Sequence, residues 1–328
     1  MKLSILDQSP VIRHQDARQA VLETLALARR AEALGYYRYW LAEHHAIAAL
    51  ADPCPELLVA RLGAETSRMR VGTGGVLLPY YSAFRTAESF RMLEALYPGR
   101  VDLGVGRAPG GDARTAQAVA GGGFPDPERF PHQVWELAAL LAGKLPPEHP
   151  YARVRLQPEV PTTPEIWLLG SSGYSGSLAS QLGLPFSFAH FINPHGGDEV
   201  MRAYRESFQA GYEQRPRTMV CTFAICGEDD ADAERLAQSI DLRRLHMALN
   251  IDAPVPTQEE AARHPYTPEE RHYVAGQRAR AVIGGPSKLR REIEAMAERY
   301  GADEVMVLTI TGDYASRTRS YERLIGAF

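Results

Sequence analysis

The stretch "EIWLLGSSGYSGSLASQLGLPFSFAHFI", residues 165–192, places two short apolar runs on either side of a segment that favours a helix. The runs at 165–172 and 185–192 have the length and composition of buried strands. The segment at 173–183 ends at a glycine, which is a common helix terminus. A helix between two strands of one sheet returns the chain to the end where the first strand began, so the strands run parallel. The stretch therefore predicts one β–α–β unit.

The same alternation of apolar runs and amphipathic helices extends to both ends of the chain. We predict strands at 2–7, 37–43, 70–79, 100–106, 165–172, 185–192, 218–226 and 303–310, and helices at 16–34, 55–67, 84–96, 173–183, 197–213, 230–248 and 315–326. Eight strands that each lead into a helix favour a closed (β/α)8 TIM barrel, which a chain of 328 residues can complete. A doubly wound open sheet is the alternative, but no GxGxxG motif opens the first strand–helix turn.

Three segments depart from this alternation. Residues 107–131 and 143–164 are rich in glycine, alanine or proline, which predicts loops. Residues 249–286 follow the seventh strand, are polar and do not fit the count of eight units. We predict a single barrel domain, 1–328, in which 249–286 form an insertion or a mobile lid.

The composition argues against several classes of function. Lys and Arg number 36 against 40 Asp and Glu, and no basic tract stands out, so neither a nucleic acid nor an anionic membrane is an expected partner. Cys54, Cys221 and Cys226 match no zinc or redox spacing, which is typical of a reducing compartment. The first residues reach Asp7 too soon for the apolar core of a signal peptide, and no apolar run is long enough to span a membrane. We expect a cytoplasmic protein.

Candidate site residues follow from barrel architecture, because active sites lie at the C-terminal ends of barrel strands. The polar residues and glycines at those ends are Asp7, Gln8, Ser9, Glu43, His44, His45, Gly74, Gly75, Arg107, Ser171, Ser172, His190 and Asn193. If the second strand continues through His45, neighbouring side chains alternate, and only one of His44 and His45 faces the mouth. No third residue with ligand spacing joins them, so we predict no metal site.

The segment "LLGSSGYSGS", residues 168–177, indicates an anion site. Small residues at a helix N-terminus let backbone N–H groups approach an anion, and Ser171, Ser172 and Ser175 add hydroxyl donors. Arg107, which follows the neighbouring strand, offers a permanent charge with two-pronged geometry for phosphate. The stretch "VIGGPSK", residues 282–288, is a rival, but there we favour Ser287 as the N-cap of a helix at 288–299.

Five segments, in order along almost the whole chain, resemble the bacterial-luciferase-like flavin monooxygenases. They are "WLAEHH" (40–45), "VGTGGVLLP" (71–79), "YPGRVDLGVGRAPG" (97–110), "WLLGSSGYSGSLASQLGLPFSFAHFINP" (167–194) and "VIGGPSKLRREIEAMAERYGADEVMVL" (282–308). The motifs "GVGRAPG" and "LLGSS" are most similar to the non-luminescent subgroup that has a single subunit type. Gly106 stands where true luciferases carry a reactive cysteine, so light emission is not expected.

The resemblance implies a (β/α)8 barrel that binds FMN at its mouth. His44 matches the histidine beside the reactive edge of the flavin ring, and Gly74–Gly75 match a small pair, usually joined by a cis peptide, that backs the ring. Arg107 matches the phosphate-binding arginine, and Ser171, Ser172 and Ser175 match the phosphate loop. Glu43, His190 and Asn193 are candidates for the substrate side of the ring, with Glu43 orienting a histidine.

The resemblance further implies a two-component monooxygenase. A separate flavin reductase supplies reduced FMN, O2 adds at the flavin C4a to give a hydroperoxide, and this oxygenates a small organic substrate. His44 acts as an acid–base group, since the ordinary pKa of histidine lies near working pH. Three alternatives remain: F420-dependent hydride transfer on the same barrel, a non-catalytic flavin-binding protein, and a metal-dependent hydrolase.

The family resemblance also implies a homodimer. Its contact would involve the helices at 55–67 and 84–96, whose apolar residues are Leu58, Leu62, Phe90 and Leu93. The alternative is that these side chains pack only on the barrel.

Overall fold

The computed structural model describes residues 1–107 and 111–328, so the last three residues of the "GVGRAPG" motif lie outside the described part. The described strands form one parallel sheet in the order β6-β5-β4-β3-β2-β1-β9-β7-β8, and pairing of β6 with β7 closes it into a barrel. The predicted TIM barrel is confirmed. The strands are β1 (Lys2–Asp7), β2 (Arg38–Leu41), β3 (Arg70–Leu77), β4 (Val101–Gly106), β5 (Glu165–Gly170), β6 (Phe186–Ala189), β7 (Thr218–Cys226), β8 (Ala281–Gly284) and β9 (Glu304–Leu308).

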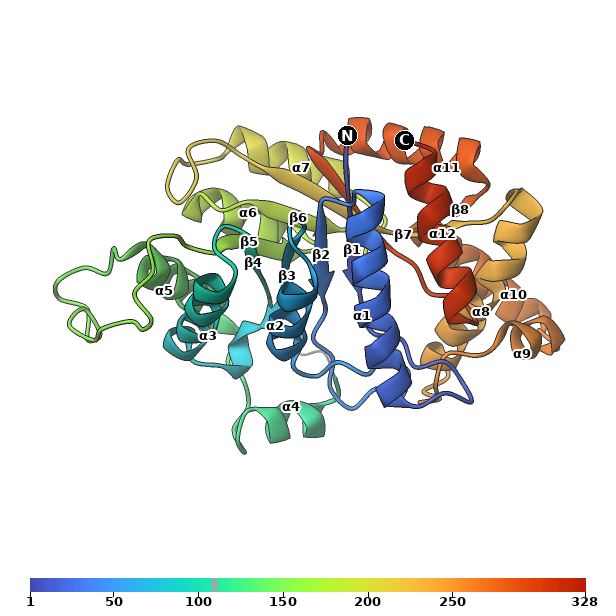
Figure 1. The fold of residues 1–328 in the computed structure, drawn as a ribbon, viewed down its shortest axis with the longest axis horizontal. Coiled ribbons are helices and arrows are strands. Elements are labelled where there is room, and N and C mark those ends of the chain that lie inside the picture. Colours follow the sequence, from blue (N-terminus) through green and yellow to red (C-terminus); the bar gives the residue numbers. More distant parts are fainter. Residues whose placement is uncertain (108–110) are drawn as a thin grey trace.

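Helices flank the barrel on its outside (Figure 1). Several begin and end where the sequence supplies capping groups: the Asp16 side chain accepts from the Gln19 N–H at the start of α1, and Gly35 ends that helix with a φ of 91°. The helices are α1 (Ala17–Leu34), α2 (Pro55–Glu65), α3 (Ala83–Leu96), α4 (Ala113–Val119), α5 (Phe130–Ala142), α6 (Gly173–Leu182), α7 (Gly197–Glu206), α8 (Asp230–Ala248), α9 (Gln258–Arg263), α10 (Pro268–Gln277), α11 (Pro286–Tyr300) and α12 (Tyr314–Gly326).

Several sequence-based boundaries are wrong. Strand β2 ends at Leu41 rather than at 43, so Glu43 and His44 lie in the loop that follows it. Helix α4 forms inside the segment predicted as a loop at 107–131, and α5 follows it without having been predicted. Helix α7 ends at Glu206, not at 213. Helix α11 begins at Pro286 with Gly285 as its N-cap, so Ser287 is not the cap.

Residues 249–286, predicted as an insertion or lid, fold into α9, α10, a short 3-10 helix (Arg278–Arg280) and β8. Capping boxes at Thr257 and Thr267 start the two helices. Both helices pack beside α8 at one side of the barrel (Figure 1). Strand β8 pairs only with the C-terminal half of β7, so it adds a ninth strand without entering the barrel. The role of the segment as a lid stays a prediction.

The N-terminal end of the barrel interior is filled by paired charges. Arg38 Nη1 lies 2.7 Å from Asp102 Oδ2, and Arg38 Nε lies 2.8 Å from Glu304 Oε1. Asp102 also accepts from Arg70 Nη2 at 2.6 Å and from Trp40 Nε1 at 2.8 Å. Because each buried charge meets an opposite charge or a donor, this network closes the end of the barrel that lies away from the strand C-termini.

Candidate active site

A cavity of about 630 Å³ lies at the C-terminal ends of the strands. Of the predicted site residues, it brings together Gln8, Glu43, His44, Gly74, Gly75, Arg107, Ser171, Ser172 and Ser175. Asp7, Ser9, His45, His190 and Asn193 are not part of its wall. Its wall is largely apolar with a few polar groups, which is typical of a site for an organic ligand. The lining residues are Leu6, Gln8, Trp40, Ala42, Glu43, His44, Gly74, Gly75, Leu77, Gly106, Arg107, Pro127, Leu169, Gly170, Ser171, Ser172, Ser175, Ser187, Ala189, Phe191, Ile192, Cys221 and Met306.

Gly74 and Gly75 present bare backbone to this cavity. The peptide bond between them is cis, as the resemblance implies. A β-carbon on Gly75 would lie 2.5 Å from the Gly104 carbonyl oxygen, and one on Gly74 would lie 2.6 Å from Leu6 Cδ1. A side chain on Gly75 would meet backbone, and one on Gly74 would have to displace Leu6, so glycine keeps the wall of β3 flat enough for a ligand to approach the backbone closely.

His44 lines the cavity from the loop after β2, and its backbone N–H donates to the Asp52 carbonyl oxygen at 3.1 Å. Its Nδ1 is buried and has no hydrogen-bond partner among residues 1–107 and 111–328. Burial lowers the pKa of His44 to about 4, and the nearby positive charge of Arg243 adds to this effect. The expectation that His44 titrates near neutral pH is therefore wrong: its ring is neutral there and offers one donor and one acceptor.

Glu43 orients a histidine, but the histidine is His45. Glu43 Oε1 lies 2.7 Å from His45 Nε2 and accepts from the Tyr81 hydroxyl at 2.6 Å. Glu43 Oε2 accepts from the Leu77 N–H at 2.8 Å. His44 lines the cavity and His45 does not, but strand alternation is not the reason, because β2 has already ended.

The part of the cavity wall that follows β4 and β5 carries Arg107 and the start of α6. Arg107 is exposed, forms no ion pair with any described carboxylate, and lies over the Tyr174 ring at 4.5 Å. Ser172 is the N-cap of α6, yet its side chain makes no capping hydrogen bond. A β-carbon on Gly170 would come within 2.2 Å of Ser175, so glycine is needed to bring that serine to the rim. The free N-terminus, the hydroxyls and the guanidinium together suit an anion.

His190 and Asn193 are engaged in other contacts. His190 is buried, with Nδ1 2.7 Å from the Tyr300 hydroxyl and Nε2 3.0 Å from the Ala279 carbonyl oxygen. Both ring nitrogens are thus used to attach β6 to α11 and to the segment before β8. Asn193 Nδ2 donates to the Ser171 carbonyl oxygen at 3.1 Å, so it fixes the backbone of the serine loop.

Sequence reasoning did not select several residues of the cavity wall. Gln8 was noted at the end of β1 but was given no role, and its buried Oε1 has no partner. Cys221 on β7 and Met306 on β9 complete the floor. The search for polar strand ends passed over these two strands because the cavity-facing residues there are apolar or weakly polar. Every residue of β7 and β9 is buried, so burial alone does not mark which of their side chains face the cavity.

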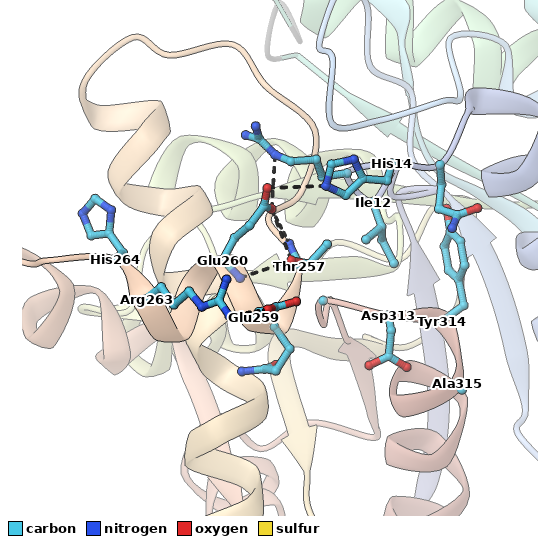
Figure 2. Close-up of a pocket in the computed structure, with 14 residues that line it drawn as sticks. Ile12, His14, Thr257, Glu259, Glu260, Arg263, His264, Asp313, Tyr314 and Ala315 are labelled. Atoms are coloured by element: carbon cyan, nitrogen blue, oxygen red, sulfur yellow. Dashed lines mark hydrogen bonds and ion pairs between the residues drawn. The ribbon is translucent and has the colours of Figure 1, made fainter.

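A second, more open groove of about 950 Å³ lies between the loop after β1, α9 and the loop after β9 (Figure 2). Glu260 is at its centre, 3.3 Å from Arg13 Nε and 3.7 Å from His14 Nε2. The same carboxylate accepts from the Thr257 N–H at 3.0 Å. The groove is larger than the cavity, but its charges already pair with one another, so it is a poorer candidate for the active site.

The described residues contain no group of three or more His, Cys, Asp or Glu side chains that could hold a metal ion. Within the same residues, no helix is both long and apolar enough to cross a membrane.

Comparison with known proteins establishes the family. The family model described as luciferase-like monooxygenase matches residues 1–304. A luciferase-like monooxygenase of Escherichia coli (strain K12) is 36% identical over 320 residues, which cover 97% of this chain and 94% of the relative. The N-acetyl-S-alkylcysteine monooxygenase of Bacillus subtilis (strain 168) is 32% identical over 331 residues, which cover 100% and 98%. The chain belongs to the luciferase-like monooxygenase family and is an oxidoreductase.

Solved structures agree with this assignment. Apo-MsnO8 is 36% identical and superposes with a TM-score of 0.92, covering 100% of this chain and 98% of its own. The oxygenating constituent of 3,6-diketocamphane monooxygenase from Pseudomonas putida, in complex with FMN, is 19% identical with a TM-score of 0.72 over 99% and 97%. An F420-dependent secondary alcohol dehydrogenase is 15% identical with a TM-score of 0.74 over 99% and 98%. At these identities, the last two structures show a common fold and no more. One contains FMN, and the other depends on F420.

Proposed function

We propose that the chain is a monooxygenase that uses reduced FMN and O2 to oxygenate a small organic substrate. Reduced FMN provides two electrons, one oxygen atom enters the substrate, and the other leaves as water. The observation that carries the proposal is the arrangement of three neighbouring walls of one cavity. A histidine whose Nδ1 has no partner among the described residues follows β2, bare glycine backbone lies on β3, and a rim suited to an anion follows β4 and β5.

The rim fits the phosphate of FMN. Arg107 provides a charge that no described carboxylate neutralises, and the uncapped N-terminus of α6 provides backbone N–H donors. The hydroxyls of Ser171, Ser172 and Ser175 lie on the same rim. Asn193 holds the Ser171 backbone in place, so the donors are positioned before the ligand arrives.

The deeper cavity fits the flavin ring. The flat backbone of Gly74–Gly75 and the apolar side chains of Leu6, Leu169 and Met306 offer surfaces for a planar aromatic group. When bound, FMN supplies the electron pair and the reaction with O2. His44 places a neutral ring with a free Nδ1 in the same cavity, where it holds or accepts a proton, and the apolar wall keeps bulk water away.

The experiment has two stages. Oxidised FMN and F420 are titrated separately into the purified protein, and we expect FMN to bind at least about tenfold more tightly. The protein is then supplied with reduced FMN, from a reductase or by photoreduction, together with ¹⁸O2 and a substrate panel. Thioethers come first in the panel, because one relative is named for N-acetyl-S-alkylcysteine. Transfer of one labelled atom to product supports the proposal.

Two other results would replace the proposal. Tight F420 binding with hydride transfer and no oxygen incorporation would make the chain an F420-dependent oxidoreductase. Tight FMN binding without turnover on any member of the panel would favour a flavin-binding protein that is not a catalyst.

We also propose a homodimer that uses the outer faces of α2 and α3. Three of the residues expected at this contact, Leu62, Phe90 and Leu93, are instead buried in the core. The same helices expose Leu57, Met92 and Leu96, which line one groove. Light scattering should report twice the chain mass for the wild type and a shift towards the monomer for Leu57→Glu combined with Met92→Glu.

A further inference from the structure

Helix α8 carries a buried cation that has no counter-charge in the described part of the chain. Arg243 is 7% exposed, its Nε has no hydrogen-bond partner, and it forms no ion pair with any described residue. The next residue, Arg244, lies over the Phe223 ring at 4.6 Å and also has a buried nitrogen, Nη2, without a partner. By contrast, Arg38 and Arg317, which are also buried, each contact a carboxylate within 2.7 Å.

An unpaired buried charge is strongly unfavourable for folding, because the protein interior replaces the water that would solvate the charge. Burial lowers the pKa of Arg243 to about 10, which still leaves the guanidinium charged at neutral pH. A buried, unpaired guanidinium therefore either lowers the stability of the fold for no purpose or binds an anion that is not part of the chain.

The neighbours of Arg243 on α8 pack towards the wall of the cavity, although Arg243 itself does not line it. Ile240, one helical turn earlier on the same face of α8, belongs to the apolar cluster that includes Leu6 and Trp40 of the cavity wall. Arg244, the next residue after Arg243, lies over the ring of Phe223. The centroid of the Phe223 ring is 5.7 Å from that of Phe191, which lines the cavity.

The chain that follows α8 ties this helix end to the site loops. Asp252 Oδ1 accepts from the Ala48 N–H at 2.9 Å, and Ala48 belongs to the same loop as His44. The Val255 N–H donates to the Val11 carbonyl oxygen at 2.8 Å, in the loop after β1. The positive charge of Arg243 contributes to the lowered pKa of His44, which agrees with this placement.

We propose that Arg243 is the anion-binding residue of the substrate subsite, so that the natural substrate is a small organic acid whose carboxylate pairs with Arg243. The inference rests on the proposed function, because it assigns the remainder of the same cavity to substrate. The phosphate rim follows β4 and β5, whereas α8 follows β7, so the two anions would bind at different β–α units of the barrel. The carboxylate end fixes the substrate, and the rest of the molecule extends towards His44 and the apolar wall.

The test uses binding and needs no turnover. Small carboxylates (acetate, benzoate, phenylacetate and N-acetylated amino acids) are titrated against their uncharged carboxamides by calorimetry, with and without oxidised FMN. The variants are Arg243→Met and Arg243→Lys. The matched control is Arg235→Met on the same helix, where Arg235 is half-exposed and pairs with Asp232 at 2.6 Å.

We expect the wild type and Arg235→Met to bind at least one carboxylate about tenfold more tightly than its carboxamide. Arg243→Met should lose this preference and Arg243→Lys should keep part of it. Arg243→Met should melt at the same temperature as the wild type or higher, because it removes an unpaired charge. NMR titration should also show a higher pKa for His44 in Arg243→Met, which a purely structural role for Arg243 would not produce.

The proposal is overturned if no carboxylate is preferred over its carboxamide, or if the preference survives in Arg243→Met. It is equally overturned if FMN competes with the carboxylate, since the anion site would then belong to the cofactor. If the protein kept its preference for carboxylates but incorporated no labelled oxygen, the proposed function would be refuted. The anion site at Arg243 would then still be supported.

Discussion

The two ends of the barrel interior treat buried polar groups in opposite ways. At the closed end, Arg38 is bonded to Asp102 and Glu304, and the Trp40 indole is bonded to Asp102 as well. At the mouth, His44 Nδ1 and Gln8 Oε1 have no partner among the described residues, although both are buried. Satisfied networks give stability, whereas unsatisfied groups cost stability and are retained where a ligand completes them. The comparison therefore separates residues that hold the barrel together from residues that await a ligand.

The largest effect is expected at the closed end. Asp102→Ala leaves Arg38 and Arg70 without their shared carboxylate and should cost about 3–5 kcal/mol in the free energy of unfolding. Urea denaturation measures this loss. The matched control is Glu159→Ala, which breaks an exposed pair with Arg155 and should cost less than about 0.5 kcal/mol. Similar losses in both variants would show that the closed end is not specially stabilised.

At the mouth, His44→Ala should have little effect on stability and a large effect on the reaction. We expect the oxygenation rate to fall by about 10²–10⁴-fold, the usual range for a group that handles a proton in the reaction. FMN affinity should change by less than about threefold, because the imidazole of His44 is not part of the phosphate rim. His14→Ala, in the open groove of Figure 2, is the control and should react at the wild-type rate. An unchanged rate in His44→Ala would remove this histidine from the mechanism.

Arg107→Met tests the rim separately from the ring pocket. Loss of one charged donor to phosphate should weaken FMN binding by about 10- to 100-fold. Quenching of flavin fluorescence on binding measures the affinity, and the dependence on salt should become shallower in the variant. The control is Arg85→Met, which removes an exposed guanidinium that bonds to Glu88, and this variant should bind FMN normally. Equal affinities for Arg107→Met and Arg85→Met would place the phosphate elsewhere.

The smallest effect concerns Asp52, whose buried Oδ2 has no partner. Burial raises the pKa of Asp52 to about 7. The folded state therefore keeps a proton on Asp52 that the unfolded state releases near pH 4. The contribution of protonated Asp52 to the free energy of unfolding is complete below about pH 4 and is lost as the pH rises to about 7. Asp52→Asn keeps the shape of the side chain but cannot ionise. Its free energy of unfolding relative to the wild type should increase by about 1–2 kcal/mol between pH 5 and pH 8. If the difference in stability between the two proteins did not depend on pH, the raised pKa of Asp52 would be contradicted.

The lowered pKa of His44 has the opposite sign. Its neutral form is favoured by folding, so the stability that depends on it is lost as the pH falls from about 6.5 to about 4. His44 is present in both proteins of the Asp52 comparison, so its contribution cancels in their difference.

The fold was predictable because each β–α unit carries its own signal. Helix α8 was predicted at its observed bounds, and α6 differs from its predicted end by one residue. Strand β8 was missed because four residues give too little pattern to distinguish a strand from a loop. Helix α4 was missed because its alanine- and glycine-rich surroundings resemble a loop, and only the capping bond from Asp112 marks its start.

The candidate site was predictable where residue type alone limits the choice, as for the glycine pair and the serine loop. His190 was placed at a strand end correctly, but nothing local shows that Tyr300 and Ala279 would use both its ring nitrogens. The low pKa of His44 and the isolation of Arg243 arise from packing between α8 and the barrel. Such long-range neighbours leave no trace in the residues themselves.

A crystal structure of the protein with bound FMN tests the central claim most directly. The account predicts phosphate against Arg107, Ser172 and the N-terminus of α6, with the ring on Gly74–Gly75 and beside His44. Phosphate at the start of α11, where the Gly285 N–H is already bonded to Asp230 at 2.7 Å, would contradict it. So would a flavin in the groove between Arg13 and Glu260.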